Sequence, residues 1–275
     1  MTLLNKQTAH LVFIGAGNMA SSIIGGLVAN GYPANLITAT DLNADQLDAL
    51  AKRTGINTTS DNQQAAAQAD AIILAVKPQV MAAVTEPLKA VTRTHKPLII
   101  SIAAGVTVDN LQHWMGPELA IIRSMPNTPA LVQTGATGLF ANNTVSSAQK
   151  AIADTIFSAI GLASWFPLET DLDAVVAISG SGPAYFFMVM EAMEEAGTKL
   201  GLSAEAAREL TLQTALGAAK LAQASDVTPA ELRRRVTSPG GTTEQAIHCF
   251  ETGGLRELFD TALQAAATRS KELAG

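Results

Sequence analysis

The feature that most constrains this sequence is a short apolar run that stops at two closely spaced glycines. Leu11–Ile14 is apolar, Gly15 and Gly17 follow, and a segment that suits a helix continues to about Asn30. This order predicts a strand, a tight turn and a helix. Gly15 permits the turn, Gly17 lets the backbone approach a phosphate without a side chain in the way, and Ala20 allows the helix to pack close to the strand. Backbone N–H groups at such a turn can bind a pyrophosphate. The stretch therefore predicts nucleotide binding, although the pattern also occurs at ordinary helix–sheet junctions.

Apolar runs alternate with segments that suit helices through the first part of the chain. Ala71–Val76 is apolar throughout, as expected of a strand that is covered on both faces. The alternation predicts an α/β fold with a Rossmann-like, doubly wound parallel sheet, whose ligand crevice lies beyond the C-terminal ends of the strands. The other strands are predicted at Leu36–Thr40, Asn57–Thr59, Pro97–Ile102, Ala120–Arg123, Ala136–Ala141 and Ala163–Phe166, with helices at about 43–53, 61–69 and 146–159.

The composition changes near Pro167, after which helix formers dominate and the pattern predicts no strand. We therefore predict two domains, a dinucleotide-binding domain over 1–166 and an all-α domain over 167–275. Ser179–Pro183 is predicted to separate the first two helices of that domain as a glycine-rich turn, with Pro183 starting the second. The helices are predicted at Leu168–Ser179, Pro183–Leu200, Ser203–Ala224, Thr228–Val236, Thr242–Thr252 and Leu255–Leu273.

The predicted helix that begins at Pro183 is apolar on every face, because Tyr185–Met190 is an uninterrupted apolar run. The segment Thr211–Ala222 is similarly poor in charge. A helix that is apolar all round must be buried on all sides. We therefore predict a homodimer through the C-terminal helices, and leave open both a higher oligomer of dimers and an ordinary monomeric helical core.

Charge and cysteine content limit the partners and the compartment. The net charge is −6, charged residues make up 15% of the chain, and the sequence has no basic tract, so a nucleic acid partner is not expected. The single cysteine, Cys249, has no partner for an internal disulfide, which favours a reducing cytoplasm. No stretch reaches the ~18 uninterrupted apolar residues of a membrane span, so no membrane association is expected.

Asp41 follows the second predicted strand, where an acidic residue accepts hydrogen bonds from the adenosine ribose and repels a 2′-phosphate. This placement favours NAD(H), because Lys52 and Arg53 stand at the far end of the next predicted helix. Thr40 and Asn43 can still donate hydrogen bonds to a phosphate, so NADP(H) remains open. Asn43 or Asp45 is expected to cap that helix, and the alternative role of Asp41 is also as its N-cap, alone or together with cofactor binding.

Other charged residues give weaker signals. Lys77 directly follows a predicted buried strand and Arg123 ends another, so each is either a crevice cation or an ordinary surface charge. The triplet Arg233–Arg235 spans most of a helical turn and is expected to be a solvated helix face. The four histidines lack metal-ligand spacing, so structural roles are expected for them and no metal site is predicted.

A second glycine-rich turn, Ser238–Glu244, precedes a helix in the C-terminal half. It offers hydroxyl groups and free backbone N–H groups at a helix N-terminus, where a carboxylate binds well. The alternative is simple helix capping, with Thr242 or Thr243 as the N-cap. Two glycines and two threonines are more than a cap requires.

Six stretches in this order resemble the pyrroline-5-carboxylate reductases, the family that catalyses the last step of proline synthesis. The resemblance covers nearly the whole chain and rests on Phe13–Ala20, Ala75–Pro78, Ser101–Thr107, Arg123–Ala130, Ser179–Tyr185 and Ser238–Thr243. It implies a Rossmann domain, a helical dimerisation domain and hydride transfer from NAD(P)H to a cyclic imine. The family often has a serine or basic residue where this chain has Asp41, so the choice between NADPH and NADH stays open.

The resemblance also implies site residues. Those for the cofactor are Ile14, Gly15, Ala16, Gly17, Asn18, Met19, Asn62, Ala75, Val76, Lys77, Pro78, Ile102, Ala103 and Ala104, and Thr40 and Asp41 join them by their position after the second strand. Those for the substrate carboxylate and ring nitrogen are Ser238, Gly240, Gly241, Thr242 and Thr243.

A protonated cyclic imine is already electrophilic, so its reduction needs mainly a hydride donor and a fixed orientation. We expect Thr243, or Thr242, to hydrogen-bond the ring nitrogen while neighbouring N–H groups bind the carboxylate. A related imine remains an alternative substrate. A hydroxyacid dehydrogenase of similar build needs a catalytic lysine where this chain has Phe186, and a non-catalytic NAD(P) sensor has no use for the Ser238–Thr243 turn.

Overall fold

The computed structural model describes residues 9–274, and its internal contacts divide the chain into two units. One unit runs to Ser181 and includes the chain from Ala266 onward, and the other is Gly182–Ala265. The predicted division into 1–166 and 167–275 stays a prediction. The two divisions differ at 167–181 and at the last helical turns, which pack with the sheet-containing unit.

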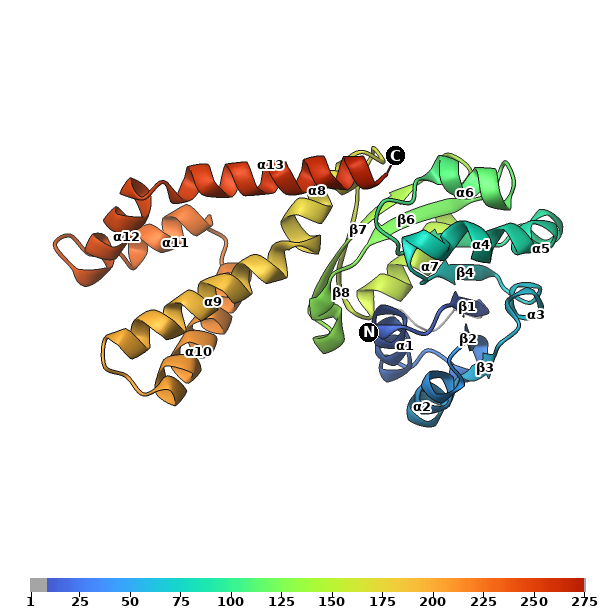
Figure 1. Ribbon diagram of the computed structural model, residues 1–275, viewed down its shortest axis with the longest axis horizontal. Helices are drawn as coiled ribbons and strands as arrows, with labels where there is room; N and C mark the ends of the chain where they lie inside the picture. The colour runs from blue at the N-terminus through green and yellow to red at the C-terminus, as the bar shows by residue number, and fades with distance from the viewer. Residues whose placement is uncertain (1–8, 275) are drawn as a thin grey trace. The chain divides into compact units, whose positions relative to one another are not determined.

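The first unit is built on one eight-stranded sheet with the order β3-β2-β1-β4-β5-β6-β7-β8 (Figure 1). Strands β1 to β6 are parallel, as predicted. The chain adds β2 and β3 on one side of β1 and then β4, β5 and β6 on the other side. Ligands of such sheets bind beyond the C-terminal ends of the strands, at the point where the chain changes side. The strands are β1 Leu11–Ile14, β2 Ile37–Thr40, β3 Asn57–Thr59, β4 Ala71–Leu74, β5 Leu98–Ser101, β6 Ile121–Met125, β7 Gly135–Ala141 and β8 Gly161–Trp165.

The last two strands run against the others, which the sequence pattern did not indicate. β7 pairs with β6 in the antiparallel direction, and β8 lies parallel to β7. Only a short helical turn, η4 (Thr128–Val132), connects β6 to β7. An antiparallel neighbour needs only a short connection, whereas a parallel one requires a crossover of a dozen or more residues.

Alternate residues of the central strands fill two separate cores, one on each face of the sheet. In β1, Leu11 and Phe13 belong to one core, whereas Val12 and Ile14 belong to the other. All four side chains are at most 1% exposed. Because the side chains of a strand alternate between faces, a strand covered on both sides must be apolar throughout.

Helices cover both faces, as the doubly wound prediction requires. The core that contains Phe13 is closed by α1 (Asn18–Ala29), α2 (Ala44–Thr54) and α7 (Ser147–Ser158). The core that contains Val12 is closed on the opposite face. Its helices and helical turns are α3 (Asn62–Ala66), η2 (Pro78–Val80), α4 (Met81–Thr85), η3 (Glu86–Leu88), α5 (Lys89–His95) and α6 (Val108–Met115). The predicted α/β fold class is confirmed.

The predicted glycine-rich break at Ser179–Pro183 is wrong. α8 (Asp171–Val175) continues through a π-helical turn, Val176–Gly180, into α9 (Gly182–Lys199). Ser181 N–H donates to the Val176 carbonyl over 2.8 Å, which is the wider hydrogen bond of a π-turn. Pro183 follows the π-turn closely and has no N–H group, and the Ser179 carbonyl one turn earlier accepts from Asn127 Nδ2 instead.

The continuous helix bears on the membrane expectation. Among the described residues, one helix, Asp171–Lys199, is long and apolar enough to cross a membrane by length and composition alone. Ser179–Pro183 interrupts its apolar run, so the expectation that no stretch reaches ~18 uninterrupted apolar residues is not contradicted. Length and composition are weak evidence for a span, because helices of a protein core pass the same test.

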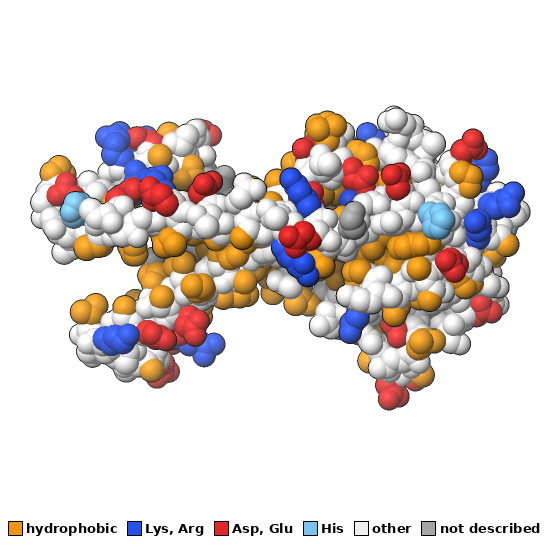
Figure 2. Space-filling view, turned by 45° about the horizontal axis from the view of Figure 1, so that its top comes forward, with side chains coloured by type: hydrophobic (Ala, Val, Ile, Leu, Met, Phe, Trp, Pro, Cys, Tyr) orange, Lys and Arg blue, Asp and Glu red, His pale blue; other side chains and the backbone are white. Residues whose placement is uncertain are grey.

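The second unit consists of helices alone, as predicted. They are α9, α10 (Ala204–Gln223), α11 (Pro229–Arg235), α12 (Thr242–Thr252) and the first part of α13 (Leu255–Leu273). Gly182, Ala207 and Thr211 are its only buried residues, and all of 182–265 is described. Apolar side chains gather along the surfaces of these helices, at the left of Figure 2. The helices therefore bury almost none of their large apolar side chains within this unit.

Candidate active site

The turn that follows β1 has the backbone conformation that only glycine adopts easily. Gly15 has φ +99°, and its N–H donates to the Thr40 carbonyl over 2.8 Å. A Cβ atom on Gly15 would lie 2.6 Å from the Ala75 carbonyl oxygen. The structure therefore brings together, at the C-terminal ends of three adjacent strands, three parts of the predicted cofactor site.

The surface beyond this turn has room and hydrogen-bond donors for a phosphate group. Gly17 is the N-cap of α1 and provides no side-chain cap, and a Cβ atom on it would meet no atom within 4 Å. The first N–H groups of a helix have no intrahelical partner, and they carry the positive end of the helix dipole. Asn18 and Met19 are in this first turn. These features fit the pyrophosphate of a dinucleotide.

Asp41 contacts the glycine-rich turn directly. Its Oδ2 accepts a hydrogen bond from Ala16 N–H at 2.8 Å, and its Oδ1 accepts one from Asn43 N–H at 2.9 Å. The N-cap interpretation of Asp41 is wrong, because the N-cap of α2 is Asn43, whose side chain accepts from Gln46 N–H. Asp41 therefore holds the glycine-rich turn before α1 and does not cap α2.

Two residues that the sequence pattern missed hold the carbonyl group of the same residue, Ala16. Gln46 Nε2 and Ser21 Oγ donate to the Ala16 carbonyl over 2.6 Å and 3.0 Å. The spacing Asn43–Gln46 resembles a capping box, which conceals this second contact in the sequence. Both sides of Ala16 are thus fixed by side chains from α1 and from the segment after β2.

The remaining predicted cofactor residues follow β2, β4 and β5. Thr40 Oγ1 donates to Asn62 Oδ1 over 2.6 Å, which orients the Asn62 amide. Within the described part of the chain, Lys77 is exposed and forms no ion pair. Pro78 starts η2 directly after it. Other predicted residues, Ile14, Ala75, Val76, Ile102, Ala103 and Ala104, lie at or beyond the C-terminal ends of their strands, so the roles of the whole set stay predictions.

Arg123 is neither a crevice cation nor an ordinary surface charge, the two roles that its position suggested. Its Nη1 lies 2.7 Å from Glu169 Oε1, and its side chain is 12% exposed. The same carboxylate oxygen accepts a hydrogen bond from Val108 N–H, at the start of α6, over 2.8 Å. Arg123 therefore ties β6 to the segment before α8 and contributes to structure.

Asn127 is a second residue whose role only the structure reveals. Its side chain, 8% exposed as a residue, accepts from Ala136 N–H over 2.8 Å and donates to the Ser179 carbonyl over 2.9 Å. It thereby joins the start of β7 to the π-turn. A Cβ atom on Gly180 would lie 3.1 Å from Met125 Cε, so the π-turn passes close to the end of β6.

The turn before α12 is open to a ligand in a way that a simple cap is not. Gly240 has φ +72°, and Gly241 N–H donates to the Ser238 carbonyl over 3.0 Å. The N-cap is Gly241 and makes no side-chain hydrogen bond, so the proposal that Thr242 or Thr243 caps this helix is wrong.

The hydroxyl groups of both threonines form no hydrogen bond among the described residues. They lie next to backbone N–H groups at the start of α12, in the first turn, where such groups lack intrahelical partners. Glu244 Oε2 accepts the Gly240 N–H over 2.8 Å. The structure therefore shows that one N–H group of this turn already binds a carboxylate.

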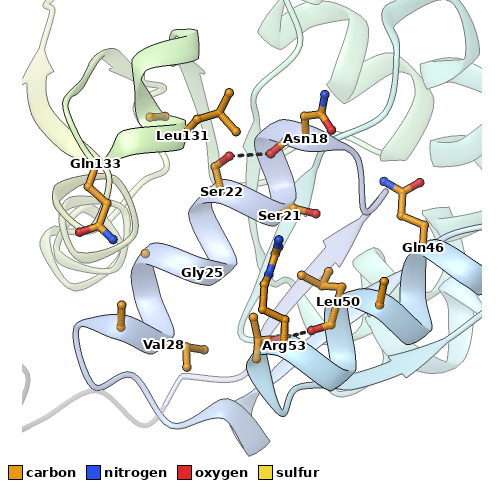
Figure 3. A pocket seen from close by; sticks show the side chains of 15 residues that line it. Asn18, Ser21, Ser22, Gly25, Val28, Gln46, Leu50, Arg53, Leu131 and Gln133 are labelled. Carbon is orange, nitrogen blue, oxygen red and sulfur yellow. Dashed lines mark hydrogen bonds between the residues drawn. The ribbon is translucent and has the colours of Figure 1, made fainter.

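Other features of the surface do not resemble a catalytic centre. A groove of about 670 Å³ runs along α1 between α2 and η4 (Figure 3). It is lined by Ser21, Ser22, Gly25 and Arg53, among others, and also by Asn18 and Gln46; Ala75 and Ile102 are not among the lining residues. The described residues contain no cluster of metal-ligating side chains. The Arg233–Arg235 triplet forms exposed ion pairs with Glu231 and Glu251.

A Rossmann-type sheet with this glycine-rich turn, followed by a helical unit, defines a class: two-unit NAD(P)-dependent oxidoreductases. Residues 10–105 match a family model described as "NADP oxidoreductase coenzyme F420-dependent", and residues 169–273 match one described as "Pyrroline-5-carboxylate reductase dimerisation". The chain is 53% identical over 268 residues to a pyrroline-5-carboxylate reductase of Pseudomonas aeruginosa, covering 98% of both chains. It is 45% identical to one of Vibrio alginolyticus, covering 96% of this chain and 97% of the relative. The chain belongs to the pyrroline-5-carboxylate reductase family.

Solved structures agree with this assignment. A pyrroline-5-carboxylate reductase of Coxiella burnetii superimposes with a TM-score of 0.95 at 49% identity, covering 98% of this chain and all of the other. That of Plasmodium falciparum, solved with NADP bound, superimposes with a TM-score of 0.86 at 31% identity, covering 98% of this chain and all of the other. The predicted enzyme class and the use of a nicotinamide dinucleotide are confirmed.

Proposed function

We propose that this chain reduces 1-pyrroline-5-carboxylate to L-proline with NADH or NADPH, in the cytoplasm and as a homodimer. Besides the family, the observation that supports the substrate is the uncapped Ser238–Thr243 turn. The substrate is a small anion with a ring nitrogen. A turn with free N–H groups and two unpaired hydroxyl groups provides donors for the anion and a polar group for the nitrogen.

In this proposal the chain binds and orients the substrate. N–H groups of Thr242 and Thr243 hold the carboxylate, assisted by the Ser238 hydroxyl group. Gly240, whose N–H donates to Glu244, shapes the turn. The Thr243 hydroxyl is oriented toward the ring nitrogen, where it hydrogen-bonds the nitrogen and fixes the imine plane. The bound dinucleotide supplies a hydride to the imine carbon.

The chain needs no strong acid for this reaction. A protonated imine carries its positive charge before the reaction begins, and hydride addition neutralises that charge. Rate then depends on orientation and on the exclusion of misaligned substrate, which fixed hydrogen bonds provide. Thr243 acts as a catalytic residue by contacting the reacting nitrogen.

The dinucleotide is bound, in this proposal, by residues of the sheet unit. The Gly15–Met19 turn binds the pyrophosphate with the backbone N–H groups of Gly17, Asn18 and Met19, because those of Gly15 and Ala16 already donate to Thr40 and Asp41. Asn62, oriented by Thr40, donates to the adenosine half through its amide group. Ala75–Pro78 and Ile102–Ala104 border the nicotinamide half.

The test is the oxidation of NADH and of NADPH, followed at 340 nm with the purified full chain and the imine. Thr243→Val keeps the side-chain shape and removes the hydroxyl group. Loss of one hydrogen bond to a charged partner is worth about 1.5–3 kcal/mol, so kcat/KM for the imine is expected to fall about 10- to 100-fold. Absence of cofactor oxidation by the wild-type chain contradicts the proposed function.

The neighbouring Thr242→Val is the matched control, because it removes the same group one residue earlier. We expect Thr242→Val to act on KM alone, through the carboxylate, and Thr243→Val to lower kcat as well. The reverse pattern assigns the ring nitrogen to Thr242, and an unchanged kcat/KM in both variants contradicts the assignment of the site.

A further inference from the structure

The carboxylate of Asp41 is fixed at both of its oxygen atoms by the backbone. Oδ2 accepts from Ala16 N–H at 2.8 Å and Oδ1 from Asn43 N–H at 2.9 Å. Asp41 itself is half-buried, whereas its neighbour Leu42 is 98% exposed. Hydrogen bonds of a charged acceptor to backbone N–H groups are about twice as strong as neutral ones. The carboxylate is therefore not free to rotate away from the position after β2.

The carbonyl group of Ala16, in the next peptide along the chain, is fixed as well. The Ala16 carbonyl accepts from Gln46 Nε2 at 2.6 Å and from Ser21 Oγ at 3.0 Å. Ala16 is fully buried, and it lies between the two glycines of the turn. The position of Asp41 and the shape of the phosphate-binding turn are thus one connected arrangement.

No cation is paired with Asp41 among the described residues. Asp45 and Asp48 follow it in α2, and Lys52 and Arg53 lie in the last turn of that helix. Arg53 lines the groove along α1 that Asn18 and Gln46 also line, but it forms no ion pair with Asp41.

A 2′-phosphate at this position meets a carboxylate that is unable to move aside. In many sites a mobile acid can turn away and admit the phosphate, but here turning away breaks two hydrogen bonds and loosens the Gly15–Gly17 turn. A ribose that carries a free 2′-hydroxyl can instead donate to a lone pair of the same carboxylate.

We propose that Asp41, held by Ala16 and Asn43, makes this chain selective for NADH over NADPH. The selection rests on the proposed function, because it concerns the cofactor of that reaction. It also couples cofactor choice to the turn: removing the carboxylate admits the 2′-phosphate and simultaneously weakens the grip on the pyrophosphate of either cofactor.

The experiment measures binding and turnover separately. Calorimetric titration of the full chain with NADH, with NADPH and with the fragments 5′-AMP and 2′,5′-ADP gives dissociation constants without any reaction. Steady-state rates at 340 nm with saturating imine give kcat/KM for the two cofactors. The wild-type chain is expected to prefer NADH at least tenfold by both readouts and to bind 5′-AMP more tightly than 2′,5′-ADP.

Three variants distinguish selection from general support of the turn. Asp41→Ser is expected to lower the NADH:NADPH ratio at least tenfold while weakening NADH binding, with the change mainly in KM. Gln46→Leu is expected to weaken both cofactors by a similar factor and leave the ratio unchanged. Leu42→Ala, next to Asp41 and directed to solvent, is expected to match the wild-type chain in all of these values.

Equal or tighter binding of NADPH by the wild-type chain overturns the inference, as does an unchanged ratio in Asp41→Ser. Either result leaves the proposed reaction intact if the imine is still reduced. A chain that binds NADH selectively but oxidises neither cofactor contradicts the proposed reaction and supports the selection. A poorly folded Asp41→Ser leaves the wild-type ratio as the deciding measurement.

Discussion

Gly15 and Gly17 stand two residues apart and serve different purposes. The backbone of Gly15 is in a left-handed conformation, and a side chain there would strike the Ala75 carbonyl. Gly17 has an ordinary φ of −61° and open space around it. Glycine at position 15 is therefore required by the fold, whereas glycine at position 17 is required only by a ligand that binds against the turn.

Substitution by alanine is therefore expected to lower the free energy of unfolding at Gly15 but not at Gly17. Gly15→Ala is expected to lower the free energy of unfolding by about 2 kcal/mol or more, because left-handed non-glycine backbone costs of order 1–3 kcal/mol before any clash. Gly17→Ala is expected to leave the free energy of unfolding within about 0.5 kcal/mol. Urea denaturation of both variants measures these changes.

Gly17→Ala is expected to weaken cofactor binding even though it leaves folding almost unchanged. The added methyl group occupies the space that a phosphate needs, so the dissociation constant for the dinucleotide is expected to rise about tenfold, or about 1.4 kcal/mol. Calorimetric titration checks this value. Normal binding by Gly17→Ala would place the pyrophosphate elsewhere.

At the scale of elements, one buried ion pair joins three segments of the sheet unit. Glu169 accepts from both Arg123 and the N-terminus of α6, so removing it leaves a guanidinium group with 12% exposure without its partner. Breaking a buried pair from one side costs about 3–5 kcal/mol, and partial exposure of Glu169 reduces this figure.

Glu169→Ala is accordingly expected to lower the free energy of unfolding by about 2 kcal/mol, measured in urea. The matched control is Glu272→Ala, which removes an exposed pair with Arg269. An exposed pair is worth about 0–1 kcal/mol, so the control should be close to neutral. Equal losses in the two variants would show that Glu169 is not specially placed.

A different ion-pair cluster connects the helices of the second unit. Glu251 on α12 lies 2.7 Å from Arg233 on α11 and 2.7 Å from Arg256 on α13. Hydrogen bonds from Arg256 and then Arg233 lower the pKa of Glu251 from 4.5 to about 2. A carboxyl with a lowered pKa in the folded state stabilises that state above its unfolded pKa.

The contribution of Glu251 should therefore be complete above about pH 5 and disappear as the pH falls through 4.5 toward 2. Glu251→Gln is expected to be less stable than the wild-type chain at pH 7 and to approach it near pH 2. Denaturation midpoints at several pH values measure the difference. Glu191→Gln, an exposed change without an ion pair among the described residues, is expected to show no such convergence.

At the scale of the whole molecule, the second unit lacks a core of its own. Phe186, Phe187 and Met188 on α9 are 68%, 62% and 69% exposed, and α10 exposes Leu210 and Leu216 by 57% and 49%. Exposed apolar surface on this scale marks an interaction site. Together with the family description of residues 169–273, it supports a dimer of this unit.

Phe187→Glu is expected to convert a particle of twice the 28.5 kDa chain mass into monomers or unfolded chain, because it places a charge in the apolar surface. Sedimentation velocity over a range of concentrations measures the mass. Leu42→Glu, a similar change at a fully exposed site of the sheet unit, should leave the mass unchanged. A monomeric wild-type chain at micromolar concentration would contradict the dimer.

The sequence by itself determined the α/β order, the two glycine-rich turns, the strands and most helices of the second unit, whereas α4, α5 and α6 were not among the predicted helices. Apolar periodicity and turn residues act over a few positions, so they are visible without the fold. The cofactor residues at the strand C-termini could also be predicted from the sequence, because parallel strands place their C-terminal ends at one edge of the sheet.

Only the tertiary structure decided which of those residues contact one another. The reversal of β7, the π-turn in place of a break, the Arg123–Glu169 pair and the role of Asn127 each depend on partners far along the chain. Asp41 shows the limit most clearly: its charge could be read from the sequence, but its fixation by Ala16 and Asn43 depends on how β1 and β2 lie together in the sheet.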